Sequence, residues 1–256
     1  MPPRFENRVA LITGAAGAIG AATATALARE GAHLALIDQA PLDAVVQACG
    51  SAVEKPLALS LDVRDGERVR NALAATMQRF GRLDILVNVA GVVSLGPAQS
   101  ITEAEWQRVL DINLKGTFLF CQAAMPLMRR QRYGRIVNLG SVIGKNGGNP
   151  RPWLDRREMD GSSNVAYGVS KAGVHALTLF LAKDLAADGV TVNAVAPGPI
   201  ATGMTVNLPE SLKRLLPIGR LGTPAEVAEA ILFLAAESAS FITGEILDVN
   251  GGLLMD

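Results

Sequence analysis

Tyr167 and Lys171 are four positions apart, near the start of a stretch that predicts a helix over 166–187. At this spacing two side chains share one face of a helix, about 5–6 Å apart. A free tyrosine has a pKa near 10 and is a weak base at neutral pH, but a nearby ammonium stabilises the phenolate. The pair therefore indicates a group that can give or take a proton near neutrality. Because the same spacing occurs by chance on many helices, the pair alone also fits a structural role.

Ser141 follows a predicted strand over 135–139, where its hydroxyl could donate a hydrogen bond to a substrate oxygen. A serine-hydrolase site needs a histidine and commonly a G-x-S-x-G turn, and neither accompanies this serine. Ser141 is therefore interpreted as a group that binds a substrate oxygen and not as a nucleophile.

Three glycines, Gly14, Gly17 and Gly20, lie between an apolar run at 9–12 and a helix predicted over 21–29. Strand, glycine turn and helix together can cradle a pyrophosphate, because the backbone turns tightly and free N–H groups at the helix start favour anions. The spacing, G-x-x-x-G-x-G, differs from the common G-x-G-x-x-G pattern. An ordinary strand–helix turn is the alternative.

Asp38 ends the next predicted strand, 33–38, at the distance from the glycines where an acid can bind an adenosine ribose. Its carboxylate would repel a 2′-phosphate, and the glycine turn has no Lys or Arg to neutralise one, so NAD is favoured over NADP. Asp62, after the third strand, could hold the adenine amino group. The alternatives are a solvated strand-end acid and a plain loop acid.

Apolar runs of strand length alternate with helical stretches along the chain, which predicts an α/β fold with a parallel sheet covered by helices on both faces. No linker interrupts this alternation, so residues 1–256 are expected to form one doubly wound domain of about seven strands. Ligands in such sheets bind beyond the carboxyl ends of the strands. Strands are expected at 9–12, 33–38, 57–61, 84–88, 135–139, 190–195 and 245–249, and helices at 21–29, 40–49, 67–80, 102–132, 166–187 and 224–237.

The composition narrows the classes of function. The chain has 256 residues, 49% of them hydrophobic and 19% charged, and its formal net charge is zero, which gives no electrostatic case for nucleic acid or an anionic membrane. The N-terminus has no apolar segment of the signal-peptide type, so a cytoplasmic location is expected. Cys49 and Cys121 are interpreted as small core residues without a disulfide, and His33 and His175 as structural or surface groups; no metal site is expected.

Several further motifs join these residues: TGAAGAIG over 13–20, NVAG over 88–91, Asn113 within DINLKG, YGVSK over 167–171, PGPIAT over 197–202 and a terminal NGG. Over nearly its whole length the chain resembles the short-chain dehydrogenases/reductases, and within them the 3-oxoacyl-(acyl-carrier-protein) reductase-like group. The resemblance implies a single-domain Rossmann fold. It also implies a homotetramer that pairs the helices of 102–132 and 166–187.

The resemblance further implies a catalytic tetrad of Asn113, Ser141, Tyr167 and Lys171. Tyr167 would be the general acid/base and Ser141 would polarise the substrate carbonyl. Lys171 would lower the tyrosine pKa and bind the nicotinamide ribose, and Asn113 would help to hold a proton-relay water. The expected cofactor contacts are Gly14, Gly17, Ala18, Ile19, Asp38, Asp62, Val63, Asn88, Ala90, Gly91, Tyr167, Lys171, Pro197, Gly198, Ile200 and Thr202, with Ile200 and Thr202 on the nicotinamide carboxamide.

Two features depart from the family pattern. Val89 replaces the usual second asparagine of N-N-A-G, and Ser141 and Tyr167 are 26 positions apart, about twice the usual gap. The additional segment, 145–164, is expected to be an ordered loop on the substrate side, since Pro150 and Pro152 restrict its backbone. A second irregular segment, 198–220, is expected to form a lid.

The inserted segment offers apolar and charged side chains to a substrate. Trp153 is expected to pack on the substrate, and one of the arginines could pair with an anionic group on it. A solvated loop or a subunit contact is the alternative. Substrate contacts are thus expected at Ser141, Ile143, Trp153 and Tyr167, and the three arginines are Arg151, Arg156 and Arg157.

The sequence as a whole predicts an oxidoreductase that transfers a hydride between NAD(H) and a secondary alcohol/ketone pair, with Tyr167 moving the proton. Three alternatives stay open: an NADPH-dependent 3-oxoacyl reductase, a catalytically silent NAD(P)-binding regulator, and an isomerase or dehydratase that uses NAD transiently. A silent protein would be expected to lack the tyrosine or the lysine, and both are present.

Overall fold

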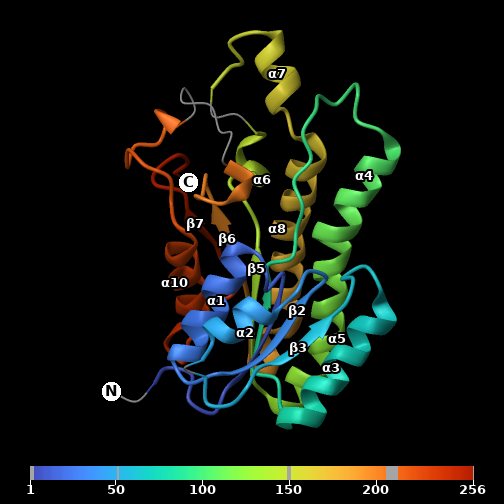
Figure 1. The fold of residues 1–256 in the computed structure, drawn as a ribbon, viewed down its shortest axis with the longest axis vertical. Coiled ribbons are helices and arrows are strands. Elements are labelled where there is room, and N and C mark those ends of the chain that lie inside the picture. The colour runs from blue at the N-terminus through green and yellow to red at the C-terminus, as the bar shows by residue number, and fades with distance from the viewer. Residues whose placement is uncertain (1–2, 51, 149–150, 206–212, 256) are drawn as a thin grey trace.

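The computed structural model describes residues 3–50, 52–148, 151–205 and 213–255. Its centre is one sheet of seven parallel strands in the order β3-β2-β1-β4-β5-β6-β7. The predicted α/β fold is therefore confirmed (Figure 1). The strands are β1 (Val9–Thr13), β2 (His33–Asp38), β3 (Leu57–Ser60), β4 (Ile85–Asn88), β5 (Gly134–Leu139), β6 (Val190–Pro197) and β7 (Ile246–Val249).

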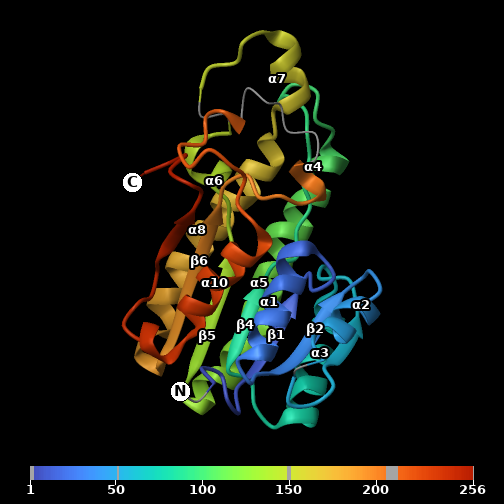
Figure 2. The same ribbon diagram turned by 60° about the vertical axis from the view of Figure 1, so that its left-hand side comes forward.

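Helices cover both faces of the sheet (Figures 1 and 2). The longer helices begin and end close to the predicted positions, except where noted below. They are α1 (Ala18–Arg29), α2 (Asp43–Ala48), α3 (Gly66–Phe80), α4 (Glu103–Leu110), α5 (Gly116–Gln131), α6 (Ile143–Asn146), α7 (Arg156–Ser162), α8 (Val165–Leu185) and α10 (Pro224–Ala235).

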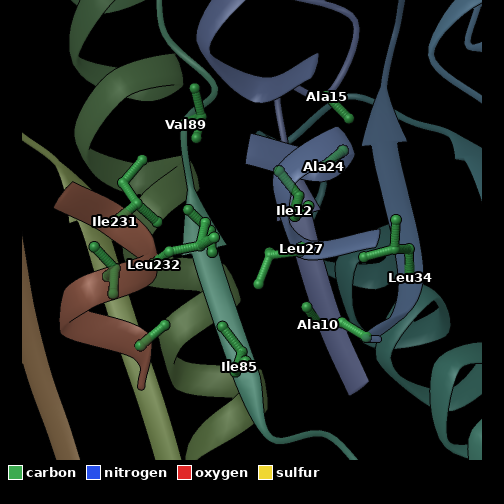
Figure 3. Close-up of a cluster of buried hydrophobic side chains, with 14 of the residues drawn as sticks. Ala10, Ile12, Ala15, Ala24, Leu27, Leu34, Ile85, Val89, Ile231 and Leu232 are labelled. Carbon is green, nitrogen blue, oxygen red and sulfur yellow. The ribbon is translucent and has the colours of Figure 1, made fainter. Parts of the chain in front are cut away.

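Alternate residues of each strand enter two separate cores, because side chains on a strand point to opposite faces. Ala10 and Ile12 of β1 pack with Leu27 of α1 and Ile231 of α10, as Figure 3 shows. Leu11, between them, belongs to a second cluster with residues of α3, α5 and α8. Strands that are buried on both faces explain the continuous apolar runs of the sequence.

The strand order reverses between β1 and β4, since β2 and β3 continue from one side of β1 and β4 lies on the other. Thr13 and Asn88, the last residues of β1 and β4, are directly paired in register. In parallel sheets a ligand crevice forms beyond such a reversal, at the carboxyl ends of the strands. The glycine turn and NVAG therefore meet at this point.

Local capping signals fix several helix starts. Thr223 and Glu226 form a complete capping box at α10, where Pro224 occupies the first turn. At α4 only half of the expected box is present: Thr102 accepts from the Glu105 N–H, but the Glu105 carboxylate binds Arg108 instead.

Three predicted boundaries were wrong in an informative way. The expected helix over 102–132 is interrupted by a π-helical turn at Asp111–Lys115, and the predicted loop of 145–164 contains α7. The helix expected over 40–49 is shorter, at Asp43–Ala48. Pro150 lies outside the described residues.

One helical stretch, Val165–Asp188, is long and apolar enough to cross a membrane by length and composition. It includes α8, whose buried residues face the second core and contact β6. Core helices of water-soluble proteins have the same composition, so this stretch is weak evidence for a membrane span.

Candidate active site

The glycine turn after β1 is closely fitted to the NVAG segment. Gly14 has φ +66°, and a Cβ built on it would lie 2.7 Å from the Ala90 backbone nitrogen. A Cβ on Gly20 would lie 2.1 Å from the Gly14 carbonyl oxygen. Any larger residue at either position would push the turn apart, so the two glycines permit a tight strand–helix turn.

Thr13 ties the two segments together. Its hydroxyl oxygen accepts the N–H groups of Val89 and Ala90 at 3.1 and 3.2 Å. Asn88 donates to Asn138 of β5 at 2.9 Å, and Val89 is buried in the first core cluster. The valine at this departure from the family pattern is thus a core residue.

The first turn of α1 points its free N–H groups into this crevice. Gly17 is its N-cap residue and Ala18 and Ile19 follow; within the described chain no side chain caps this helix end. Uncapped N–H groups carry partial positive charge and suit a phosphate. The turn and helix start therefore fit the pyrophosphate of a dinucleotide.

Asp38 lies beside the glycine turn. Its carboxylate accepts the Ala16 N–H at 2.9 Å and the Ala40 N–H at 3.0 Å. These two hydrogen bonds fix the carboxylate at the turn and leave further lone pairs for another donor. The ribose contact expected of Asp38 stays a prediction.

Asp62 differs from the expectation, because its carboxylate is occupied by Arg64. The Arg64 side chain donates from Nε and Nη2 to both carboxylate oxygens, at 2.6 to 3.0 Å. The same guanidinium holds the pKa of Asp62 below its usual range. The next residue, Val63, is buried against Gly116 of α5. The adenine contacts assigned to these residues stay predictions, and for Asp62 an adenine amino group would have to share the carboxylate with Arg64.

Tyr167 and Lys171 lie on one face of α8, as their spacing predicted. The Lys171 ammonium is 5.8 Å from the centroid of the Tyr167 ring and donates to the Leu139 carbonyl at 2.6 Å. A Cβ on Gly91 would lie 3.5 Å from that ammonium and 3.3 Å from Asn113 Oδ1. The structure therefore brings the NVAG segment, Asn113 and Lys171 together.

Asn113 lies in the π-helical turn between α4 and α5 and is fully buried. Its side chain exchanges two hydrogen bonds with the Val92 backbone, and Nδ2 also donates to Ser170 Oγ at 2.9 Å. The Ser170 hydroxyl in turn donates to the Tyr167 carbonyl at 2.7 Å. Asn113 is thus connected to the helix that carries Tyr167 and Lys171.

Ser141 follows β5 and contacts the phenol of Tyr167. Burial raises the pKa of Tyr167 above its ordinary value, and a hydrogen bond with Ser141 opposes the rise. Burial lowers the pKa of Lys171 to about 8, so its ammonium is largely charged at neutral pH. A direct effect of Lys171 on the tyrosine pKa stays a prediction.

The segment after β6 follows the same edge of the sheet. Pro197 ends β6, and the Gly198 N–H bonds to the Val249 carbonyl. Ile200 is buried and forms a β-bridge with Gly222, while the Thr202 N–H donates to Thr205 Oγ1. The expected lid, 198–220, is described only in part, since 206–212 lie outside the described residues.

The inserted segment projects beyond the carboxyl ends of the strands and ends in α7, above α6 and α8 (Figures 1 and 2). Arg151 and Glu158 form a two-pronged ion pair at 2.6 and 3.0 Å, and Asp155 caps α7. Trp153 is half-buried in this segment and Leu154 is 71% exposed. The direct substrate contacts of Trp153 and of Ile143, on α6, stay predictions.

The charged groups of the insertion are mostly paired within it. Arg151 binds Glu158 and Arg156 binds Asp160, whereas Arg157 is exposed. The contact of one of these arginines with a substrate anion stays a prediction.

Cys49 and Cys121 are free and buried, as expected. Among the described residues there is no cluster of three or more histidine, cysteine, aspartate or glutamate side chains that could hold a metal ion.

The chain belongs to the short-chain dehydrogenase/reductase family. A family model described as enoyl-(acyl carrier protein) reductase matches residues 14–254. The 3-oxoacyl-[acyl-carrier-protein] reductase FabG of Thermotoga maritima is 40% identical, over 98% of this chain and 100% of its own. A (2S)-[(R)-hydroxy(phenyl)methyl]succinyl-CoA dehydrogenase subunit, BbsD of Thauera aromatica, is 39% identical over 97% of each chain.

A solved structure agrees with these matches. The crystal structure of gox2181 superposes with a TM-score of 0.88 at 36% identity, covering 98% of this chain and 97% of that one. The chain is thus an oxidoreductase of this family. The family model is described as an enoyl reductase, one relative as a 3-oxoacyl reductase and the other as a substituted succinyl-CoA dehydrogenase, so the family alone does not fix the substrate.

Two buried polar residues at the site were not recognised in the sequence. Ser170 links Asn113 to α8, and His175 accepts the Ser141 N–H at 3.3 Å. The signal for His175 was available: Tyr167, Lys171 and His175 are spaced by four and follow one stripe of the helix. The interpretation of His175 as a merely structural or surface group overlooked this spacing.

Proposed function

We propose that the protein is an NAD(H)-dependent oxidoreductase that interconverts a secondary alcohol and a ketone. The observation that carries the proposal is the meeting of Tyr167, Lys171, Ser141 and Asn113 beside the glycine turn at the carboxyl edge of the sheet. A nicotinamide cofactor supplies the hydride acceptor or donor when bound. The residues supply orientation, charge and a proton path.

In the direction of oxidation, Tyr167 Oη accepts the proton of the substrate hydroxyl as the hydride leaves the carbinol carbon. Ser141 Oγ donates a hydrogen bond to the same substrate oxygen, and the base that accepts the proton is the Tyr167 phenolate. The charge of Lys171 stabilises that phenolate. In reduction the same groups act in reverse, and Tyr167 donates the proton to the developing alkoxide.

Asn113 contributes by position. Its side chain is held by Val92 and Ser170, and its own hydrogen bonds set the π-helical turn against α8. We assign to it the support of a water chain that passes protons from Lys171 to solvent. Its burial keeps this chain in a fixed place.

Asp38 supports the choice of NAD. Its carboxylate is fixed at the glycine turn by the Ala16 and Ala40 N–H groups, where a 2′-phosphate would meet a like charge. Arg64, which follows strand β3, is paired with Asp62. An NADPH-dependent 3-oxoacyl reductase is the second candidate, because several relatives are described as 3-oxoacyl reductases.

The names of the relatives share a ketone or a secondary alcohol as the reacting group. One relative is a (2S)-[(R)-hydroxy(phenyl)methyl]succinyl-CoA dehydrogenase subunit, and others are 3-oxoacyl-[acyl-carrier-protein] reductases. We propose a small secondary alcohol or ketone as the substrate, with the insertion and Trp153 forming one wall of its site. NAD linkage favours oxidation in a catabolic reaction over a biosynthetic reduction.

Assembly as a cytoplasmic homotetramer is part of the proposal. Large apolar side chains remain exposed on the two helices that would pair: Phe118 on α5, and Leu179 and Phe180 on α8. Phe180 is 73% exposed. Burial of such side chains between subunits would be favourable.

The experiment is a panel of secondary alcohols with NAD and with NADP, followed by nicotinamide absorbance, in wild type and Tyr167→Phe. The Tyr167→Phe variant should bind NADH as tightly as wild type, and its turnover should be lower by about 10²-fold or more, since a general acid/base is lost. Turnover equal to wild type would contradict the assignment of Tyr167. Net NADH formation also excludes a silent binding protein and an enzyme that uses NAD only transiently.

A further inference from the structure

The end of β5 extends beyond its neighbour β4. Asn138 is level with Asn88, the last residue of β4, so Leu139 and Ser141 have no strand beside them on that side. On the other side the N–H groups of Gly140 and Val142 continue the ladder to β6, at Val195 and Pro197. Since peptide groups alternate along a strand, the Leu139 carbonyl and the Ser141 N–H point away from β6.

Helix α8 provides partners for both of these backbone groups. Lys171 Nζ donates to the Leu139 carbonyl at 2.6 Å, and one helical turn later His175 Nε2 accepts the Ser141 N–H at 3.3 Å. Tyr167, Lys171 and His175 are spaced by four, so a single stripe of α8 contacts the reacting groups and the strand end that carries Ser141.

We propose that His175 is a positioning residue for Ser141, whose N–H it binds so that the serine hydroxyl is held against Tyr167. The inference rests on the proposed function, because it deepens the account of the same site. His175 is not among the expected substrate or cofactor contacts. It acts through the backbone of Ser141.

The chain makes room for the imidazole at two glycines. A Cβ on Gly140 would lie 2.2 Å from His175 Nε2, and a Cβ on Gly144 would lie 3.0 Å from Cε1. Both glycines flank Ser141, one before it and one on α6 after it. The ring therefore packs directly against the backbone that presents the serine.

The surroundings keep the imidazole neutral. Burial, and after it the charges of Lys145 and Lys171, together lower the pKa of His175 to about 4. A neutral imidazole has one acceptor nitrogen, whereas an imidazolium has none. At neutral pH His175 can therefore accept the Ser141 N–H.

The Ser141 hydroxyl is then fixed from two sides. The backbone N–H is bound by His175, and Oγ accepts the Ile143 N–H at 3.2 Å. A displacement of a catalytic group by about 1 Å can cost on the order of 10² in rate. Loss of the histidine contact should therefore affect turnover more than cofactor binding.

The test compares His175→Leu, which removes the acceptor, with His175→Gln, whose amide oxygen can reach the same N–H. We expect kcat to fall about tenfold in the leucine variant and to recover largely in the glutamine variant, with the Kd for NADH unchanged in both. Leu181→Ala is the matched control: it loses core packing on the same helix, away from Ser141, so its Tm should fall while kcat stays.

A double-mutant cycle with Ser141→Ala separates positioning from general structure. If His175 acts through the serine hydroxyl, His175→Leu should lower kcat much less in the Ser141→Ala background than in wild type. Equal losses in both backgrounds would overturn the proposal. If the leucine variant does not fold, His175→Asn replaces it, because the shorter asparagine amide cannot reach the Ser141 N–H. Equal kcat in the asparagine and glutamine variants would also overturn the proposal.

A measurement without turnover tests the contact itself. Nitrogen NMR of labelled wild type at neutral pH should show His175 unprotonated at Nε2 and protonated at Nδ1, and a proton on Nε2 would contradict the inference. An inactive wild type on every alcohol and ketone would overturn the proposed function together with this one. An active wild type with unchanged kcat in His175→Leu overturns only the positioning role.

Discussion

The buried imidazole of His175 should make the stability of the fold depend on pH in a defined window. Its pKa is about 4 in the folded chain, against 6.5 for an ordinary histidine. Between these values the unfolded chain binds more protons than the folded one, so the free energy of unfolding falls as the pH falls. The loss attributable to this group should be about 2 kcal/mol at pH 5 and about 3 kcal/mol at pH 4.

Two lysines near this histidine act in the same direction as its burial. Lys145 on α6 and Lys171 on α8 both oppose its protonation, and Asp248 on β7 pairs with Lys145 at 2.9 Å. Asp248 partly neutralises the charge of Lys145 at His175. Burial is the largest cause of the lowered pKa.

The assay is urea unfolding of wild type and His175→Gln at pH 7, 6 and 5. Carboxylates titrate in both proteins, so the difference between them isolates the histidine. The glutamine variant should lose about 2 kcal/mol less than wild type between pH 7 and pH 5. Parallel stability curves would refute both the lowered pKa and the buried neutral contact with Ser141.

Two further predictions concern the cofactor and the substrate. Wild type should prefer NAD over NADP in kcat/KM, and Asp38→Ser should narrow that preference by removing a like charge; a wild-type preference for NADP would show the argument from Asp38 to be wrong. Trp153→Ala should raise the substrate KM while the Kd for NADH hardly changes, and Leu154→Ala, at a largely exposed neighbour, serves as its control. Unchanged KM in the tryptophan variant, or loss of the tetramer with normal kinetics per site, would leave the insertion as a surface loop or a subunit contact.

The sheet was predictable because its signals are local and repeated. The run His33–Asp38 is a strand with the predicted ends, and Thr223 with Pro224 began the last helix as expected. Strands buried on both faces leave continuous apolar runs in the sequence. The glycine turn was predictable for the same reason, since its geometry depends on residues close together in the chain.

Contacts between distant segments were harder to predict. Even a local pair can be hard to predict. Asp62 and Arg64 are two residues apart, but spacing alone does not decide whether their side chains pair or point to solvent or a ligand. The contact of His175 with Ser141 depends on how far β5 extends beyond β4, a difference in strand length that only the assembled sheet defines. The π-helical turn at Asn113 likewise has no residue signal of its own.

Helix α7 was missed because its segment is rich in Pro, Gly and Asn at its start, which favours a loop. The later part, from Asp155, has the cap and the ion pairs that stabilise a short helix, and Arg151 reaches back to Glu158 from outside it. A search for caps inside segments already assigned as loops would have found it.

Both ends of the inserted segment are held by contacts with other parts of the structure. Its first residues belong to α6, which packs on α8. Its last residues are held by Gly96, which lies in the segment between β4 and α4. The Gly96 N–H donates to the Ser163 carbonyl at 2.6 Å, and Gly96 pairs with Asn164 in a β-bridge. Both ends of the insertion are therefore fixed on the N-terminal side of Tyr167. Additional residues between two fixed ends add little to the entropic cost of closing the loop. Changes in α7 should then alter which alcohol is accepted while proton transfer at Tyr167 stays the same. We therefore predict that selectivity depends on α7 and proton transfer on Tyr167, two parts of one continuous segment between Ser141 and Lys171.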